Sequence, residues 1–416
     1  MFEWTLVLVA IIDDLERGRR RLRNVVVAGV GMTPFGKFPS QDLKQLTSVA
    51  VRDALKDAGI ETDDIEYVAF ANAVGGAITG QEMVAGQVCL APIGLRSIPI
   101  LNVENACASA STALAVAYLS VASGQVDVAL AVGAEKMTHP DKKVSHEAIS
   151  RAGDVEVVAA KRARNEIEVS YFMDLYARAA RKYLATTDAT PEDFAGVAVK
   201  NQRNGSLNPR AQYGGSYSVE DILRSAVVVA PLHLLMCSPI SDGAAAAVVM
   251  AEERLAKNRD QRRKVRILAS QVTSGGWLSA GQPRAVPLAA HKAFEQAGLG
   301  PDDIDCLELH DATAPAELEL YESMGFAEPS EGVRLIREGA TALSGKIPAN
   351  TSGGLLAKGH PIGATGLAQV CEVIWQLRGE AGERQVDGAQ IALTQNGGGW
   401  VSEDNAAASV HIFATI

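Results

Sequence analysis

Cys107 is the residue of this sequence best placed to act as a nucleophile. It lies in the segment 102–111 (NVENACASAS), where an apolar run gives way to small residues that can begin a helix. Unpaired backbone N–H groups and the helix dipole stabilise a thiolate at a helix start, so the sequence predicts a thiol pKa below the usual ~8.5. The same N–H groups could hold the oxyanion of a thioester under attack. The alternative is a small buried side chain without chemistry, the more common role of a free cysteine.

Two histidines are candidate partners of this thiol. His360 lies in the segment 358–366 (KGHPIGATG), in which glycines and a proline place it close to a helix start. A histidine there could take the thiol proton and later donate to an oxyanion, and the alternative is an ordinary loop histidine. His310 ends an apolar, strand-like segment and precedes Asp311, a place suited to an oxyanion donor. The segment 395–399 (QNGGG) offers close backbone approach and further N–H donors.

The elements that must position these residues occur twice along the chain. The segment 53–66 (DALKDAGIETDDIE) recurs as 292–305 (KAFEQAGLGPDDID), and 125–131 (QVDVALA) is echoed by 385–393 (QVDGAQIAL). Each copy of the first repeat predicts an amphipathic helix that ends at glycine, then an acidic turn and an apolar strand. Two similar copies of alternating helices and strands predict an α/β fold of duplicated halves, related by a pseudo-twofold axis.

The duplication places the segments around Cys107 and His360 in equivalent loops, so the pseudo-twofold axis can bring the two side chains face to face. Between the halves lies a less regular stretch, which we expect to cover the substrate. The expected divisions of the chain are an extension outside the fold (1–22), the first part of the N-terminal half (23–134), a loop or cap insertion (135–222), the end of the N-terminal half (223–255) and the C-terminal half (256–416).

Composition restricts the classes of function. The net charge of −10, from 39 Lys and Arg against 49 Asp and Glu, argues against a nucleic-acid-binding surface. The apolar stretch 4–12 is too short to span a bilayer and no cleavage site follows it, so we expect neither a membrane span nor a secretion signal. The five cysteines show no CxxC spacing, which predicts free thiols in a reducing, cytoplasmic setting and no metal site.

Together these residues resemble the thiolase superfamily over nearly the whole chain. The specific parts are the segment around Cys107, the GHPIG box at 359–363 and SDGAA at 241–245. The His-Asp pair at 310–311 and GMTPFG at 31–36 are similar to the sterol-carrier-protein branch of that superfamily. The resemblance implies the thiolase fold, in which duplicated βαβαβαββ halves form a five-layered αβαβα sandwich. It also implies a coenzyme A thioester as substrate and no bound cofactor.

The resemblance implies roles for individual residues. Cys107 becomes the acylated nucleophile, and His360 becomes the base that activates it. His310 and His360 form one oxyanion hole, and the backbone N–H groups of Cys107 and Gly397 form the other. Ser238 lies where the family contacts the pantetheine part of coenzyme A.

The sequence departs from the family at one functional position. Thiolases use a second cysteine to move the α-proton, at a place where this chain has Gln395 or, in the sterol-carrier branch, Ala312. Neither side chain can transfer a proton, and general acid–base help is worth roughly 10²- to 10⁴-fold in rate. We therefore expect acylation of Cys107 to outrun carbon–carbon chemistry, unless His360 itself or a water held by His310 moves this proton.

The implied activity is acyl transfer in lipid or fatty acid metabolism, by 3-ketoacyl-CoA thiolysis or the reverse Claisen condensation through an acyl-Cys107 intermediate. One alternative is a thiolase-like retro-aldolase that acts on a CoA ester. Another is a non-catalytic lipid-binding or scaffold homologue. The resemblance further implies a homodimer, or a dimer of dimers, paired through residues 98–103, and a small OB-fold, zinc-ribbon protein as a partner.

Overall fold

The computed structural model describes residues 22–255, 264–276 and 281–416. Their main sheet has nine strands in the order β3-β2-β4-β7-β1-β8-β11-β10-β9, and β5 and β6 form a separate two-stranded sheet. The strands are β1 (Val25–Met32), β2 (Tyr67–Ala71), β3 (Ile100–Val103), β4 (Val128–Glu135), β5 (Val227–Val229), β6 (Leu232–His233), β7 (Gly243–Ala251), β8 (Val265–Ser274), β9 (Cys306–Glu308), β10 (Ile391–Gly398) and β11 (Ala407–Thr415).

The strand order shows the duplication directly. From β1 outward, β7 and then β4 pair antiparallel, and β2 pairs parallel with β4. From β8 outward, β11 and then β10 pair antiparallel, and β9 pairs parallel with β10. The two sets meet where β1 pairs with β8, at Val26 opposite Arg266 and Val27 opposite Val265. The predicted α/β fold of duplicated halves is confirmed.

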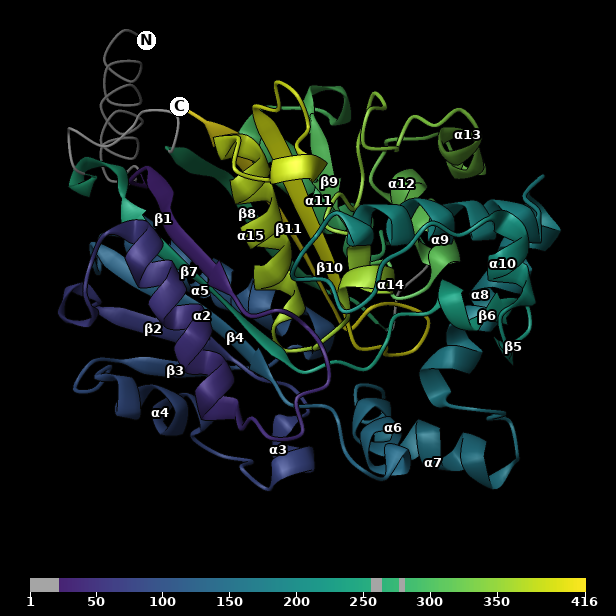
Figure 1. The fold of residues 1–416 in the computed structure, drawn as a ribbon, viewed down its shortest axis with the longest axis horizontal. Helices are drawn as coiled ribbons and strands as arrows, with labels where there is room; N and C mark the ends of the chain where they lie inside the picture. Colours follow the sequence, from purple (N-terminus) through teal and green to yellow (C-terminus); the bar gives the residue numbers. More distant parts are fainter. Residues whose placement is uncertain (1–21, 256–263, 277–280) are drawn as a thin grey trace, which may run out of the picture.

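Four long helices complete the layers (Figure 1). They are α2 (Leu43–Ala58), α5 (Ser109–Ala122), α11 (Ala285–Ala297) and α15 (Thr365–Arg378). Helices α5 and α15 pack against each other and contact strands of both halves, whereas α2 covers the far side of β1 and β7 and α11 that of β8 and β11. This gives the predicted αβαβα sandwich. Because strands such as β1 are covered on both faces, every residue of β1 is buried, which explains its continuous apolar sequence.

Small residues allow the layers to approach closely around the two loops of interest. Strand β7 contains four consecutive alanines after Gly243. On β4, a Cβ at Gly133 would lie 2.4 Å from the carbonyl oxygen of Gly363, so only glycine fits there. Strand β4 of the first half therefore packs directly against the loop that follows His360 of the second half.

The stretch between β4 and β7 is mostly helical. Its helices are α6 (Lys142–Ser150), α7 (Val155–Ala163), α8 (Tyr171–Thr186), α9 (Pro191–Ser206) and α10 (Val219–Arg224). Helix α8 begins after Ser170, whose hydroxyl accepts a hydrogen bond from the backbone N–H of Met173. This insertion packs on the second half, since Phe194 and Ile222 share a core with Leu318.

The remaining helices connect strands near the loops of interest. In the first half these are α3 (Gly75–Thr79) and α4 (Ala85–Leu90), and in the second half α12 (Ala314–Ser323), α13 (Gly332–Arg337) and α14 (Gly354–Lys358).

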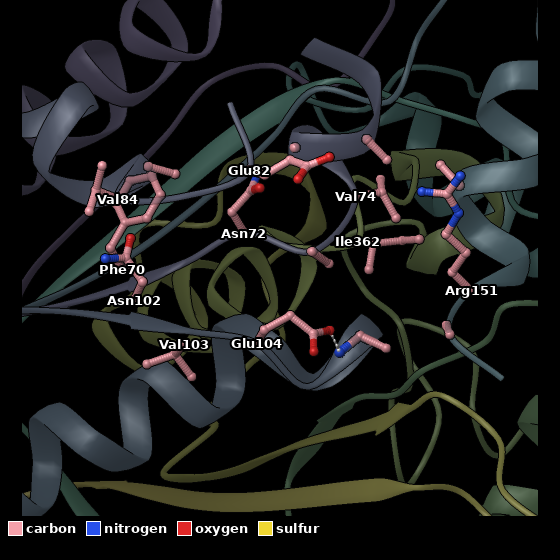
Figure 2. A pocket seen from close by; sticks show the side chains of 17 residues that line it. Phe70, Asn72, Val74, Glu82, Val84, Asn102, Val103, Glu104, Arg151 and Ile362 are labelled. Atoms are coloured by element: carbon pink, nitrogen blue, oxygen red, sulfur yellow. Dashed lines mark hydrogen bonds between the residues drawn. The ribbon is translucent and has the colours of Figure 1, made fainter. Parts of the chain in front are cut away.

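Strand β3 forms one edge of the main sheet. It pairs with β2, and no other strand of the described residues pairs with its outer side. Leu101 on this strand is 44% exposed. Beside β3 opens a cavity of ≈420 Å³, lined among others by Asn102, Glu104 and Arg151 (Figure 2). This edge therefore lies next to the turn that carries Cys107.

The expected extension 1–22 falls outside the described residues except for its last residue. Its neighbour Arg23 is anchored, because its guanidinium donates to Asp127 at 2.7 Å. Among the residues that the structure describes, no helix has the length and apolar character needed to cross a membrane.

Candidate active site

Cys107 lies at a helix start, in a 3₁₀ turn (Ala106–Ala108) that continues into α5. Ala106, directly before it, has φ of 48°, a left-handed conformation that is uncommon for a residue with a Cβ. Two hydrogen bonds hold the turn: the Ser109 hydroxyl accepts from the backbone N–H of Asn105 at 2.8 Å and donates to the Ala106 carbonyl at 2.6 Å. The short side chains after Cys107 thus fix the backbone that presents the thiol.

The loop between α14 and α15 presents His360. Gly359 has φ of 105°, and a Cβ there would lie 2.5 Å from the Ser241 hydroxyl oxygen, so glycine is required on both counts. The same hydroxyl accepts a hydrogen bond from the backbone N–H of His360 at 3.2 Å. Ser241 belongs to the SDGAA segment, so this segment positions the His360 backbone.

Thr365 fixes the tautomer of His360. Its hydroxyl oxygen lies 2.7 Å from His360 Nδ1 and 2.9 Å from the carbonyl oxygen of Pro361. A carbonyl can only accept, so the single hydroxyl proton points to Pro361 and the hydroxyl accepts from Nδ1–H. Nε2 of His360 therefore carries a lone pair and can take a proton.

His310 follows β9 and is held by its own loop. Its backbone N–H donates to Oε1 of Gln395 at 3.2 Å. The next residue, Asp311, accepts from the backbone N–H of Leu355 at 2.7 Å and so caps the start of α14. His310 Nε2 lies 3.4 Å from His360 Nε2, and because the latter has the lone pair, His310 Nε2–H is the donor.

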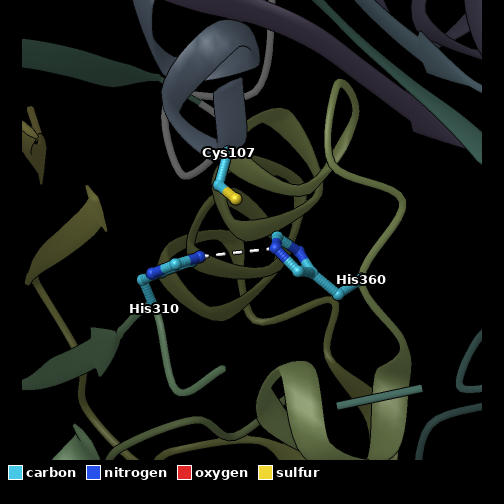
Figure 3. Close-up of side chains that lie close together, drawn as sticks. All are labelled: Cys107, His310 and His360. Atoms are coloured by element: carbon cyan, nitrogen blue, oxygen red, sulfur yellow. Dashed lines mark hydrogen bonds between the residues drawn. The ribbon is translucent and has the colours of Figure 1, made fainter. Parts of the chain in front are cut away.

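The structure brings together the three side chains that the sequence singled out. The sulfur of Cys107 and ring nitrogens of His310 and His360 all lie within 4.8 Å of one another. Figure 3 shows the thiol and the two imidazoles turned toward one another. The centroids of the His310 and His360 rings lie 5.1 Å apart. Such a group is close enough for a metal ion, but the sequence predicts none and we assign the sulfur to covalent chemistry instead.

All three groups are uncharged at neutral pH. Burial raises the pKa of the Cys107 thiol to about 12, although backbone N–H groups of Gly399 and of Cys107 itself lower it. Burial lowers the pKa of His310 to about 4, and burial, helped by His310 and Lys358, holds the pKa of His360 well below its usual value. The predicted low thiol pKa is wrong, because removal of the sulfur from water outweighs the amide groups of the helix start.

One cavity of ≈580 Å³ contains the remaining predicted residues. Ser238, Ala312, Gln395 and Gly397 line it together with Cys107 and the two histidines. Helix α8 of the insertion closes one side through apolar and aromatic side chains, including Phe172, Met173 and Tyr176. Of the glycines after Gln395, Gly399 directs its backbone N–H at the sulfur of Cys107. The family resemblance implies Gly397 for the oxyanion hole.

Several residues beside the candidate active site were not among the residues predicted from the sequence. Glu308 and Lys358 form a buried ion pair of 3.1 Å, and each side chain is 1% exposed. Each stands two residues before one of the histidines, a spacing that was visible in the sequence. Thr365, the first residue of α15, follows His360 by five residues, which was also visible in the sequence. Tyr176 gave no signal, because the path of the insertion depends on tertiary packing.

The raised thiol pKa predicts the alkylation behaviour of Cys107. The thiolate is the reactive form, so the rate of modification by iodoacetamide should rise about tenfold per pH unit from pH 7 to pH 10 without a plateau. Mass spectrometry of the Cys107 peptide over time measures this rate. A plateau below pH 9 would show that the thiol ionises near its ordinary pKa after all.

Comparison with known proteins places the chain in one family. Residues 25–253 match the family described as "Thiolase, N-terminal domain", and residues 279–414 match "Thiolase C-terminal domain-like". The chain is 40% identical over 399 residues to an acetyl-CoA acetyltransferase of Methanothermobacter thermautotrophicus, covering 94% of this chain and 100% of the relative. It is 36% identical over 385 residues to the benzoylsuccinyl-CoA thiolase subunit BbsB of Thauera aromatica, covering 91% and 95%.

Solved structures agree on the fold. The Ltp2–ChsH2(DUF35) aldolase superposes with a TM-score of 0.77 at 25% identity, covering 94% of this chain and 98% of that chain. Human mitochondrial 3-ketoacyl-CoA thiolase in complex with CoA superposes with a TM-score of 0.70 at 16% identity, covering 95% and 99%.

Proposed function

The chain belongs to the thiolase family of acyltransferases, and we propose that it catalyses 3-ketoacyl-CoA thiolysis or the reverse Claisen condensation through an acyl-Cys107 intermediate. The observation that carries this proposal is the meeting of the Cys107 sulfur with the ring nitrogens of His310 and His360, all within 4.8 Å in one cavity. A nucleophile, a base with a lone pair and an N–H donor are the three groups that acyl transfer requires.

The first half of the proposed reaction acylates Cys107. As the sulfur attacks the substrate carbonyl, its proton moves to the lone pair of His360 Nε2. The resting thiol is uncharged, so its proton must leave before or during the attack. The bond from the carbonyl carbon to the leaving group then breaks, and the CoA thiolate or enolate that leaves takes this proton from His360. The oxygen that becomes negative would be held by the backbone N–H groups of Cys107 and Gly399, or of Gly397 as the family resemblance implies.

Coenzyme A would enter along α8. Arg178 and Lys182, one helical turn apart on that helix, and Arg284 line the cavity, and none has an ion pair with a described residue. The carboxylate of Glu319, in the same cavity, interacts electrostatically with Lys182 and Arg284, which leaves the three cations in excess over it. Such an excess of positive charge suits the phosphates of coenzyme A, and Ser238 is the candidate contact for its pantetheine part.

Removing two of these cations should weaken coenzyme A binding. The double substitution Arg178→Ala and Lys182→Ala should raise KM for CoA about tenfold or more, since a hydrogen bond to a charged group is worth roughly 1.5–3 kcal/mol. Steady-state thiolysis of acetoacetyl-CoA measures the change. The matched control uses a pantetheine thiol as acceptor, which lacks the nucleotide phosphates and should show an unchanged KM. An equal loss with both acceptors would contradict the assignment.

We further propose a homodimer, or a dimer of dimers, paired through β3. An unpaired edge strand with exposed Leu101 beside a cavity would otherwise favour uncontrolled association. We also propose a small OB-fold, zinc-ribbon protein as a partner, and the similar Ltp2–ChsH2(DUF35) aldolase is likewise named for two components. All five cysteines are free, which supports our proposal of a cytoplasmic setting.

The second candidate function is a retro-aldolase, supported by the likeness to that aldolase structure. The retained Cys107 argues against it, because a retro-aldol cleavage needs no acyl-cysteine. Incubation with radiolabelled acetyl-CoA separates the two, since only the acyltransferase leaves label on the protein. CoA-dependent cleavage of acetoacetyl-CoA and of longer 3-ketoacyl-CoA substrates tests the main proposal. Absence of both label and cleavage would favour the third alternative, a non-catalytic lipid-binding or scaffold homologue.

A further inference from the structure

Gln395 carries an amide donor that the mechanism above does not use. Its side chain is 1% exposed and lines the catalytic cavity. Oε1 accepts a hydrogen bond from the backbone N–H of His310 at 3.2 Å, whereas Nε2 has no hydrogen-bond partner among the residues that the structure describes. A backbone N–H can only donate, so Oε1 must face His310 and the orientation of the amide is fixed.

A buried donor without a partner is costly and calls for a partner that the apo structure does not contain. Gln395 and His310 are joined by that hydrogen bond and both line the catalytic cavity, and the side chain of each carries an N–H donor. Two such donors in a site for CoA thioesters suit one carbonyl oxygen that becomes negative during the reaction.

The lone pair of His360 Nε2 is engaged in the resting site and could become available when substrate binds. In the resting site His310 Nε2–H points at the lone pair of His360 Nε2, over 3.4 Å. A substrate oxygen that takes this hydrogen bond from His310 releases the lone pair of His360. The side chain of Thr365 keeps that lone pair on Nε2. Binding of the thioester oxygen would therefore free a base beside the reacting carbon.

We propose that Gln395 Nε2 and His310 Nε2 donate to the thioester oxygen of the CoA thioester that forms or loses the carbon–carbon bond, and that His360 Nε2 carries its α-proton. This inference rests on the proposed function. It assigns to one histidine the proton transfers that other thiolases divide between a histidine and a second cysteine, and it makes Gln395 a catalytic residue in place of that cysteine.

The proton and the electron pair are accounted for at each step without a further acid or base. In condensation, His360 Nε2 takes the α-proton, and the electron pair of that C–H bond forms the bond to the acyl carbon on Cys107. The C–S bond to Cys107 then breaks, and the sulfur takes the proton from His360 Nε2. A 3-ketoacyl-CoA leaves, with Cys107 and His360 in their starting protonation states. Thiolysis runs through the same steps in reverse.

The test separates the two halves of the reaction in the whole protein. Exchange of labelled CoA into acetyl-CoA reports acylation of Cys107, and exchange of the acetyl methyl protons with D₂O, followed by NMR, reports enolate formation. Gln395→Met keeps the length of the side chain but removes the donor. We expect methyl exchange and thiolysis to fall about 10²- to 10³-fold, the usual loss for one oxyanion donor, while CoA exchange stays near its original rate. His360→Asn is the matched control and should lose both.

Gln395→Glu provides a second measurement, the pH dependence of methyl exchange. A purely structural role of Gln395 would not predict this dependence. Its buried carboxyl can still accept from His310, and it regains a donor only when protonated. Methyl exchange should therefore recover as the pH falls through the pKa of this carboxyl, while CoA exchange shows no such recovery. Equal loss of both exchanges in Gln395→Met, or loss of neither, overturns the inference. If the unmodified protein shows no CoA exchange, the proposed function itself fails, a result distinct from those outcomes.

Discussion

Replacing Cys107 with alanine is expected to abolish thiolysis of acetoacetyl-CoA, with a loss on the order of 10⁶-fold, as found when the nucleophile of a catalytic group is removed. The physical reason is that, among the described residues that line the cavity, Cys107 is the only cysteine. His310 and His360 remain as neutral imidazoles, and without the sulfur there is no atom to carry the acyl group. Steady-state rates measure the loss, and intact mass should show no acetyl adduct after incubation with acetyl-CoA.

Cys237→Ala is the matched control for this prediction. Cys237 is also half-buried, and burial likewise raises the pKa of its thiol to about 12. Its sulfur donates to the backbone carbonyl of His233, 3.4 Å away, and it does not line the catalytic cavity. The control variant should keep its thiolysis rate and its acetyl adduct. If Cys107→Ala keeps full turnover, the assignment of the nucleophile is wrong.

The proximity of the loops that carry Cys107 and His360 could be predicted because the duplication is visible in the sequence. The repeated helix-turn-strand segments imply equivalent positions for Cys107 and His360, and the strand order on either side of the β1–β8 contact has that symmetry. The glycine before His360 could be predicted for another reason: its φ of 105° is a local requirement of the backbone, whereas its contact with Ser241 joins segments distant in sequence. Local backbone requirements and internal repeats can therefore be predicted from the sequence.

Properties that depend on closure of the cavity could not be predicted. The helix-start position of Cys107 favoured a low thiol pKa, but the insertion and the second half remove the sulfur from water and reverse the shift. In the sequence, Gln395 stands where the thiolase resemblance implies a proton carrier, and its side chain cannot transfer a proton. Only the hydrogen bond from His310 shows that it is an oriented donor. The sign of an electrostatic effect, and the direction of an amide, are set by neighbours distant in sequence.

Lys358→Met is expected to lower the stability of the fold by about 3–5 kcal/mol, the usual cost of breaking a buried ion pair by removing one partner. Lys358 Nζ lies 3.1 Å from Glu308 and 2.7 Å from the Ser352 hydroxyl, with both charged side chains 1% exposed. Without the lysine, the carboxylate of Glu308 stays buried with no cation. For a chain of this length, the entropy of unfolding converts this loss to a fall in thermal midpoint of about 3–6 °C.

Two comparisons show whether the lost charge, rather than the lost side chain, causes this fall. Adding Glu308→Gln to Lys358→Met removes the uncompensated charge, so the double variant should recover most of the midpoint. Lys346→Met breaks the exposed pair with Asp302, whose side chains are 79% and 98% exposed, and should leave the midpoint nearly unchanged. A double variant no more stable than Lys358→Met would mean that the contacts of the lysine stem, not its charge, hold the two segments that lead into His310 and His360 together.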